Sequence, residues 1–130
     1  MKSIECSEIL HRLITKKSFI HQGKATSAAF LLREQDKGLS VNILSLRSLE
    51  DSLNPEKSLK DIQMVSSLHT GHVQAISGEI YIQHSPTEIN PGHAEIMGIP
   101  QQKNDLARAE YLAGKLRDQA RTIWQKPSKL

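Results

Sequence analysis

The sequence predicts an α+β protein in which helices cover an antiparallel sheet. Three observations support this class: an amphipathic segment near the C-terminus, short stretches in which apolar and polar residues alternate, and turns rich in Gly and Pro between them. We therefore expect about five strands, formed by two hairpins plus one strand. These strands would pack against N-terminal, middle and C-terminal helices.

The first predicted element is a helix from Ser3 to Ser18. Its apolar residues recur near helical spacing, and Ser3 is a candidate N-cap. Acidic residues in its first turns and lysines in its last match the helix dipole. A connector or short strand that ends in a turn follows, from Phe19 to Gly23.

The segments Lys24 to Arg33 and Leu39 to Leu44 are predicted to form the first hairpin. A polar loop closed by Gly38 separates them, and the second segment alternates cleanly between apolar and polar residues. In that segment Ser40 and Asn42 would face solvent or a shallow site. The Ala28-Ala29 pair leaves a helical alternative open for the first segment.

The middle of the chain predicts a short helical turn after Ser48 and then a helix from about Pro55 to Ser67. Pro55 suits the first position of a helix. Apolar residues at 59, 62, 65 and 68 are consistent with one buried stripe.

A second hairpin is predicted from Gly71 to Ser77 and from Glu79 to His84, because both segments alternate around a Ser-Gly turn. A loop with two prolines follows. The segment from His93 to Ile99 is then predicted as the fifth strand, ended by Pro100.

The clearest helix is predicted from Asn104 to Gln125, with Asn104 or Asp105 as its cap. Its apolar and small residues repeat at alternating steps of three and four. We expect one domain over residues 1–126 and a frayed tail over 127–130.

Cysteine content and hydropathy indicate a cytoplasmic location. The single cysteine, Cys6, excludes an internal disulfide. The N-terminus lacks the apolar core of a secretory signal, and no apolar run approaches the roughly 20 residues of a membrane span. We therefore expect no contact with a membrane.

Charge is unevenly distributed along the chain. Residues 1–24 and 103–130 together carry a net charge of +7, whereas residues 25–102 carry −4. If the two terminal helices pack side by side, they would form one positive surface that suits an anionic partner. The alternative is an ordinary solvated helix surface. The predicted partner-binding residues are Arg108, Lys115, Arg117 and Arg121.

His93 and Glu95 are the leading candidates for catalysis. In a strand the two side chains project from the same face, where an imidazole tuned by a carboxylate can transfer protons. His21, Thr26 and Ser27 are candidate supporting groups. The alternative is structural: His93 would bond to the preceding loop, Glu95 would pair with a surface cation, and the hydroxyls would bond where a strand begins.

Other chemistry has less support in the sequence. There is no glycine loop that cradles phosphate and no GxSxG motif, which disfavours the corresponding hydrolases. No cofactor is expected. A weaker alternative is a zinc site formed by His69, His72 and His84, although their spacing matches no standard motif.

Three stretches, Ala29-Phe30, Leu39-Ser40-Val41 and Asn90 to Gly98, resemble a group of small bacterial proteins of unknown function. These proteins share an AF…LSV…NPxHAxIxG layout followed by a C-terminal helix. The resemblance implies no activity and no site. In that pattern the position of Glu95 is less fixed than that of His93, which favours His93 as a single residue over the pair.

Two functions follow from these observations, and whether the chain is an enzyme stays open. The first is a binding or accessory module that presents a basic helical surface to a nucleic acid or a protein. The second is a small hydrolase or transferase, similar to a toxin or nuclease, with His93 as its acid/base. A third alternative is a subunit that functions only inside a larger assembly.

Overall fold

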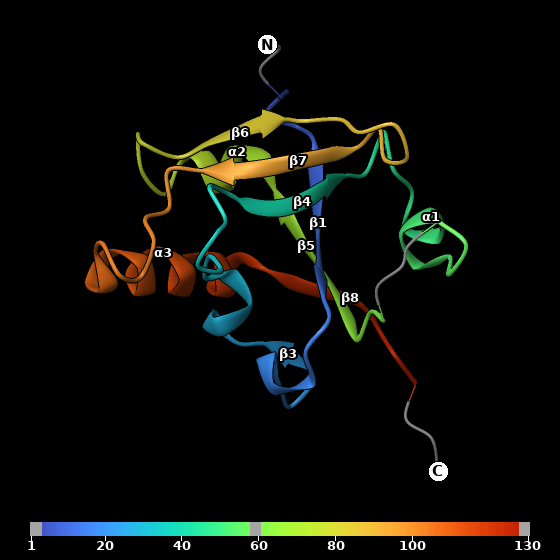
Figure 1. The fold of residues 1–130 in the computed structure, drawn as a ribbon, viewed down its shortest axis with the longest axis horizontal. Helices are drawn as coiled ribbons and strands as arrows, with labels where there is room; N and C mark the ends of the chain where they lie inside the picture. The colour runs from blue at the N-terminus through green and yellow to red at the C-terminus, as the bar shows by residue number, and fades with distance from the viewer. Residues whose placement is uncertain (1–3, 58–60, 128–130) are drawn as a thin grey trace.

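The computed structural model describes residues 4–57 and 61–127 and has the predicted α+β fold with an antiparallel sheet (Figure 1). The sheet has six strands rather than the five expected, in the order β6-β7-β4-β1-β5-β8. These strands are β1 (Ile9–Ile14), β4 (Leu39–Ile43), β5 (Met64–His69), β6 (Tyr81–His84), β7 (His93–Met97) and β8 (Arg121–Gln125).

The remaining elements are short, with one exception. Strands β2 (Ile20–His21) and β3 (Lys24–Ala25) form a separate hairpin. The helices are η1 (Lys17–Phe19), η2 (Ser27–Phe30), α1 (Leu49–Leu53), α2 (Thr70–Gln74) and the longer α3 (Leu106–Gln119), of which η1 and η2 are 3₁₀ helices. None of the helices within the described residues has the length and apolar character needed to cross a bilayer.

Several predicted elements are confirmed. The strand beginning at His93 is β7, and the segments after Gly38 and Glu79 contain β4 and β6. The predicted helical turn is α1, in which the Ser48 side chain accepts a hydrogen bond from the Asp51 amide at 3.0 Å. Asp105 caps α3 by accepting from the Arg108 amide at 3.1 Å.

Two predicted helices are wrong, because their central residues form strands. β1 lies within the segment predicted as the N-terminal helix, and β5 overlaps the predicted helix from Pro55 to Ser67, of which residues 58–60 lie outside the described chain. Both strands are interior to the sheet and bury residues on both faces: Leu10 and His11 are both buried in β1. A strand buried on both faces loses the alternation by which it would be recognised.

The hairpins and the end of the last helix also differ from the prediction. The first segment of the first hairpin is β3 followed by η2, in line with the helical alternative that Ala28-Ala29 left open. The first segment of the second hairpin contains the helix α2. α3 ends at Gln119, and extended backbone at Ala120 leads into β8. Most of the predicted tail, 128–130, lies outside the described residues.

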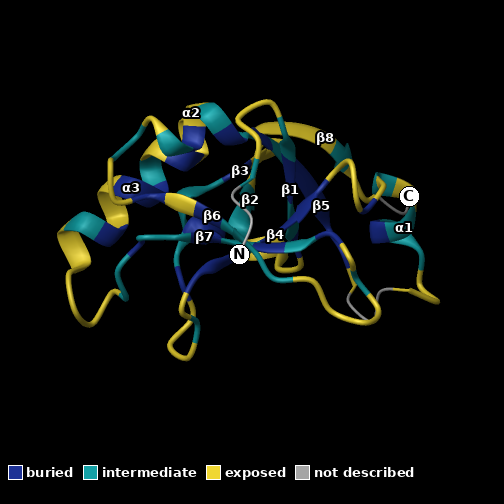
Figure 2. Cartoon of the chain, turned by 90° about the horizontal axis from the view of Figure 1, so that it is seen from above, coloured by how far each residue is buried: buried dark blue, intermediate teal, exposed yellow. Residues whose placement is uncertain are grey.

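The hydrophobic core joins the sheet to α3 and η2. Fully buried side chains come from the inner face of α3, from η2 and from strands across the sheet (Figure 2). Phe30 of η2 and Leu112 and Leu116 of α3 are among the largest of these side chains. This packing fixes η2 against α3, and a hydrogen bond from Arg12 of β1 to the Ala29 carbonyl connects it to the sheet.

Candidate functional site

The residues predicted as catalytic lie in two separate hollows. His93 lines a hollow of about 310 Å³ beside β4, whereas His21, Thr26 and Ser27 line another of about 790 Å³ beside β8. Glu95 lines neither of them. The predicted catalytic group is therefore not brought together at one point.

His93 is fixed by a single backbone contact. Its Nδ1 lies 3.0 Å from the carbonyl oxygen of Ser85. Because a carbonyl can only accept, Nδ1 carries the proton, and in the neutral ring Nε2 keeps its lone pair. Nε2 makes no hydrogen bond to any described residue, so the ring can accept a proton there.

Glu95 lies on the same face of β7 as His93, as the spacing predicted. The strand register places it beside Ser40 of β4 and Gln83 of β6. Within the described residues its carboxylate forms no ion pair and no hydrogen bond, and it does not contact His93 through either.

Four further residues line the hollow of His93: Arg12, Asn42, Arg47 and Asn90. The sequence predicted a shallow site only for Asn42 and connected none of the four with His93. The Asn90 amide donates to Asn42 Oδ1 at 2.8 Å, and the Asn42 amide donates to Ser52 Oγ at 3.0 Å. This chain of bonds fixes two amides beside the hollow. Arg12 could have been noticed in the sequence, because it is the only Lys, Arg, Asp or Glu in the largely apolar stretch from Ile9 to Ile14.

The second hollow, which we call the basic groove, is lined by residues from both ends of the chain. It lies where the β2–β3 hairpin meets the end of α3 and the start of β8. Its polar and charged lining residues are His21, Gln22, Lys24, Thr26, Ser27, Ser66, Arg117, Asp118, Arg121 and Thr122. The groove therefore joins His21 and Ser27, predicted as catalytic, to Arg117 and Arg121, predicted to bind a partner.

Hydrogen bonds fix the walls of the basic groove. Thr122 Oγ1 donates to the Gly23 carbonyl at 3.0 Å, which ties β8 to the hairpin, and Thr26 Oγ1 donates to the Phe19 carbonyl at 2.9 Å. Ser66 Oγ, on a residue only 1% exposed, has no hydrogen-bond partner in the described structure. A buried hydroxyl without a partner is rare in proteins.

The cations of the basic groove differ in how they are paired. Arg117 pairs with Asp118 at 2.9 Å. Lys24 and Arg121 are exposed, and neither forms an ion pair with another described residue. Two unpaired positive charges therefore face solvent at this groove.

The other two predicted partner-binding residues lie apart from each other. Lys115 lines an adjoining hollow of about 610 Å³ that shares Ser27, Arg117 and Asp118 with the basic groove. Its Nζ lies 5.4 Å from the centre of the exposed Tyr111 ring. Arg108, near the other end of α3, donates to Ser77 Oγ at 3.0 Å and lies 3.6 Å from a Glu79 carboxylate oxygen.

The histidines of the alternative zinc site do not form a cluster. The rings of His69 and His72 stack with centroids 4.4 Å apart, while Nε2 of His84 lies 2.8 Å from the Pro91 carbonyl oxygen. In the described parts of the chain, no three His, Cys, Asp or Glu side chains are placed to hold a metal ion.

Comparison with known protein families, curated proteins and solved structures finds no match to this chain. The resemblance to small bacterial proteins stays a prediction.

Proposed function

We propose that this chain binds single-stranded nucleic acid, with the phosphates of the strand along the basic groove. The observation that carries this proposal is the convergence of cations from both basic ends of the chain. Lys24 lies in the N-terminal segment and Arg121 in the C-terminal segment, yet both line the same groove without an ion pair among the described residues. Such a surface attracts a polyanion.

The neutral groups of the groove also suit phosphate. Ser27 lines the groove, and its Oγ makes no hydrogen bond to another described residue. Hydroxyl groups commonly donate to phosphate oxygens beside arginine and lysine. The arrangement offers both charge and neutral donors to a phosphate.

An exposed aromatic ring favours a single-stranded nucleic acid over an acidic protein. Tyr111 is 55% exposed and lines the hollow that adjoins the groove. Unpaired bases stack on such rings, and Lys115 beside the ring adds another cation for the backbone.

The proposal is tested by fluorescence anisotropy with a labelled single-stranded oligonucleotide of mixed sequence. We expect binding by the wild-type chain, and binding weakened at least about tenfold by the double substitution Lys24→Ala/Arg121→Ala, because two phosphate contacts are lost. Lys37→Ala/Lys103→Ala is the matched control, since both lysines are exposed and line neither the groove nor its neighbour.

The control variant should bind like the wild type. An equal loss in both double variants would mean that only net charge matters, which contradicts a defined groove. Absence of binding by the folded wild-type protein at about 50 mM salt would also contradict the proposal.

A second candidate function, a small hydrolase or transferase, rests on His93. The bond from Nδ1 to the Ser85 carbonyl leaves Nε2 as a base on a ring that lines the hollow beside Arg12 and Asn42. The test is turnover of a panel of phosphate-ester and acyl-ester substrates by the wild type, His93→Gln and Glu95→Gln. We expect His93→Gln to abolish turnover and to keep the fold.

Glu95→Gln distinguishes a mechanism that uses His93 alone from one that uses His93 together with Glu95. Because Glu95 does not line the hollow, we expect this variant to retain most of the activity. Full activity in folded His93→Gln would remove His93 from the mechanism.

A further inference from the structure

The sheet opens between its two central strands. β1 pairs with β5 over six residues, from Ile9 to Ile14, but it pairs with β4 only at Leu10 and His11. Beyond this point β1 and β4 diverge, and the sheet divides into β6-β7-β4 and β1-β5-β8. In Figure 1 the first three strands run across the view, whereas β1 and β5 run steeply down it.

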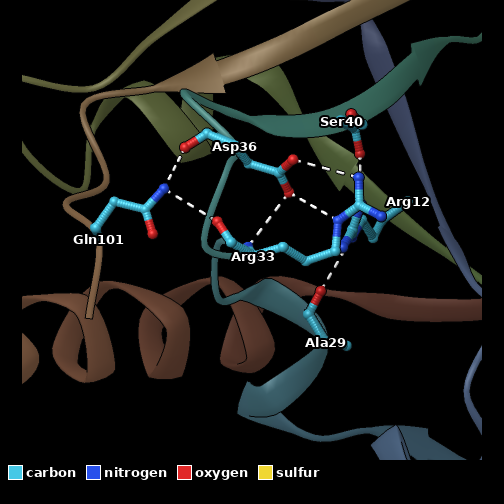
Figure 3. Close-up of polar contacts among 6 residues, drawn as sticks. All are labelled: Arg12, Ala29, Arg33, Asp36, Ser40 and Gln101. Atoms are coloured by element: carbon cyan, nitrogen blue, oxygen red, sulfur yellow. Dashed lines mark hydrogen bonds and ion pairs between the residues drawn. The ribbon is translucent and has the colours of Figure 1, made fainter. Parts of the chain in front are cut away.

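Arg12 occupies this opening, because it is the first residue of β1 after the last pair with β4. Its Nη1 donates to the Ser40 carbonyl at 2.9 Å, and its Nε donates to the Ala29 carbonyl of η2 at 2.9 Å (Figure 3). The guanidinium thus connects both halves of the sheet to η2. Nη2 makes no hydrogen bond to a described residue and keeps two N–H donors.

The positive charge of Arg12 has no carboxylate partner in the described structure. The nearby Asp36 accepts from Arg33 through both oxygens, from Nε at 3.0 Å and from Nη2 at 3.2 Å. Burial lowers the pKa of Arg12 to about 10, which reflects the poor solvation of its charge, although Asp36 offsets part of the effect. A partly buried cation of this kind is normally paired.

Two hollows flank Arg12, and the one that contains His93 is the more positive. The first, of about 390 Å³, has Arg12, Lys16 and Arg33 in its lining but also Glu34 and Asp36. The second, of about 310 Å³, has three cations and no acidic residue in its lining: Arg12, Arg47 and Lys57, of which Lys57 pairs with Asp51 at 3.0 Å. Arg47 is only 7% exposed, and it donates from Nη1 to the Ile89 carbonyl at 3.1 Å and from Nη2 to the Lys57 carbonyl at 3.2 Å.

We propose that the hollow containing Arg12, Arg47 and His93 binds an organic phosphate, with the phosphate group on the free Nη2 of Arg12 and with Arg47 adding positive charge. Hydrogen bonds from a charged guanidinium to phosphate oxygens are short and strong. Leu13, Val41 and Ile89 line the same hollow and offer apolar contact to the organic part. Its volume is at the small end of the range for small-molecule sites.

This inference is independent of the basic groove, with which the hollow shares no residue. It deepens the second candidate function by naming a substrate class. The binding holds whether or not His93 performs chemistry.

The test is isothermal titration calorimetry with two probes, adenosine 5′-monophosphate and ribose 5-phosphate, against adenosine, ribose and succinate. We expect both phosphates to bind and all three phosphate-free compounds to fail at concentrations up to about 10 mM. Arg12→Gln should abolish binding. Because this variant can also lose its fold, Lys57→Glu serves as a second variant at an exposed residue of the same hollow.

We expect Lys57→Glu to weaken phosphate binding at least about tenfold, since it places a carboxylate beside the ligand. Lys17→Glu is the matched control, at an exposed lysine that lines neither hollow, and should bind normally. The proposal is overturned if neither phosphate binds, if succinate binds as well as the phosphates do, or if binding is lost in Lys24→Ala/Arg121→Ala and kept in Lys57→Glu. Unchanged turnover in His93→Gln would leave this binding result intact and would affect only the proposed chemistry.

Discussion

The basic groove and the Arg12 opening both present positive charge, but they hold it in different ways. In the groove, Lys24 and Arg121 are exposed side chains at a surface. In the opening, Arg12 is fixed by two backbone carbonyls at 2.9 Å, and Arg47 is buried. The first arrangement suits a long, mobile polyanion, and the second suits a small ligand held in one orientation.

Both regions depend on the helix η2, and the largest effect that we expect is the loss of stability when η2 loses its anchor in the core. Ser27 of η2 lines the groove, while the carbonyl of Ala29 in η2 accepts from Arg12. Phe30→Ala should lower the free energy of unfolding by about 3–5 kcal/mol, because the fully buried ring holds η2 in the core. Urea unfolding measures this loss. Leu106→Ala, at an exposed position of α3, should change it by less than about 0.5 kcal/mol. A small effect of Phe30→Ala would contradict the common support.

A matched pair of arginine substitutions tests the difference between the regions directly. Arg12→Gln should lower stability by about 1–3 kcal/mol, since the Ala29 and Ser40 carbonyls lose their donors. Arg121→Gln removes an exposed, unpaired charge and should change stability by less than about 0.5 kcal/mol. Both values come from denaturant unfolding. Equal losses of stability in the two variants would contradict the claim that Arg12 is held by the fold while Arg121 is only a solvated surface charge.

The stability of the fold should also depend on pH through His11, which lies in β1 beside Arg12. Burial lowers the pKa of His11 below its ordinary value of 6.5. Its neighbours across the strands, Asn42 and Ser67, carry no charge. The unfolded chain therefore binds a proton more readily than the folded chain, and stability is lost as pH falls below about 6.5.

The measurement is the melting temperature at about pH 7.5 and about pH 5.5, compared between the wild type and His11→Gln. The lowered pKa values of Asp36 and Asp61 place their titration below this window. The wild type should lose more stability on acidification than the variant does. An identical decrease in both proteins would mean that His11 does not contribute to it.

Local signals in the sequence predicted part of this fold correctly. Alternation after Gly38 predicted β4, the Pro-Gly turn before His93 predicted β7, and the regular apolar spacing after Asp105 predicted α3. In β4 the polar residues Ser40 and Asn42 alternate with apolar ones although Asn42 is buried, so the periodicity survives in the sequence. The interior strands β1 and β5 have buried residues at adjacent positions, which removed that signal.

The end of α3 could not be predicted from local sequence for a related reason. The apolar spacing of the helix continues through Ile123, and no Gly or Pro marks its end. The chain nevertheless turns extended at Ala120, and Thr122, Ile123 and Trp124 have side chains that favour strands. Pairing of β8 with β5 stabilises the strand there, and that contact between distant segments is not visible in local sequence.

The candidate sites depend on contacts of the same kind. The uneven charge distribution indicated a positive surface only on the condition that two terminal helices packed side by side, whereas the N-terminal segment is the strand β1. Residues of both basic ends nevertheless line one groove. The contact of Arg12 with Ser40 depends on where two strands diverge, which no local pattern records. His93 was recognisable as a candidate catalytic residue, because it follows a clear turn and shares a strand face with Glu95.

The most direct test of the account maps both ligands on the ¹H–¹⁵N spectrum of the same protein. A single-stranded oligonucleotide should shift amides at residues 21–27 and 117–122, and adenosine 5′-monophosphate should shift amides at residues 40–42 and 90–93. Each ligand should leave the other set unchanged. Both ligands shifting a single common set of amides would contradict the claim that this chain carries two distinct sites for anions.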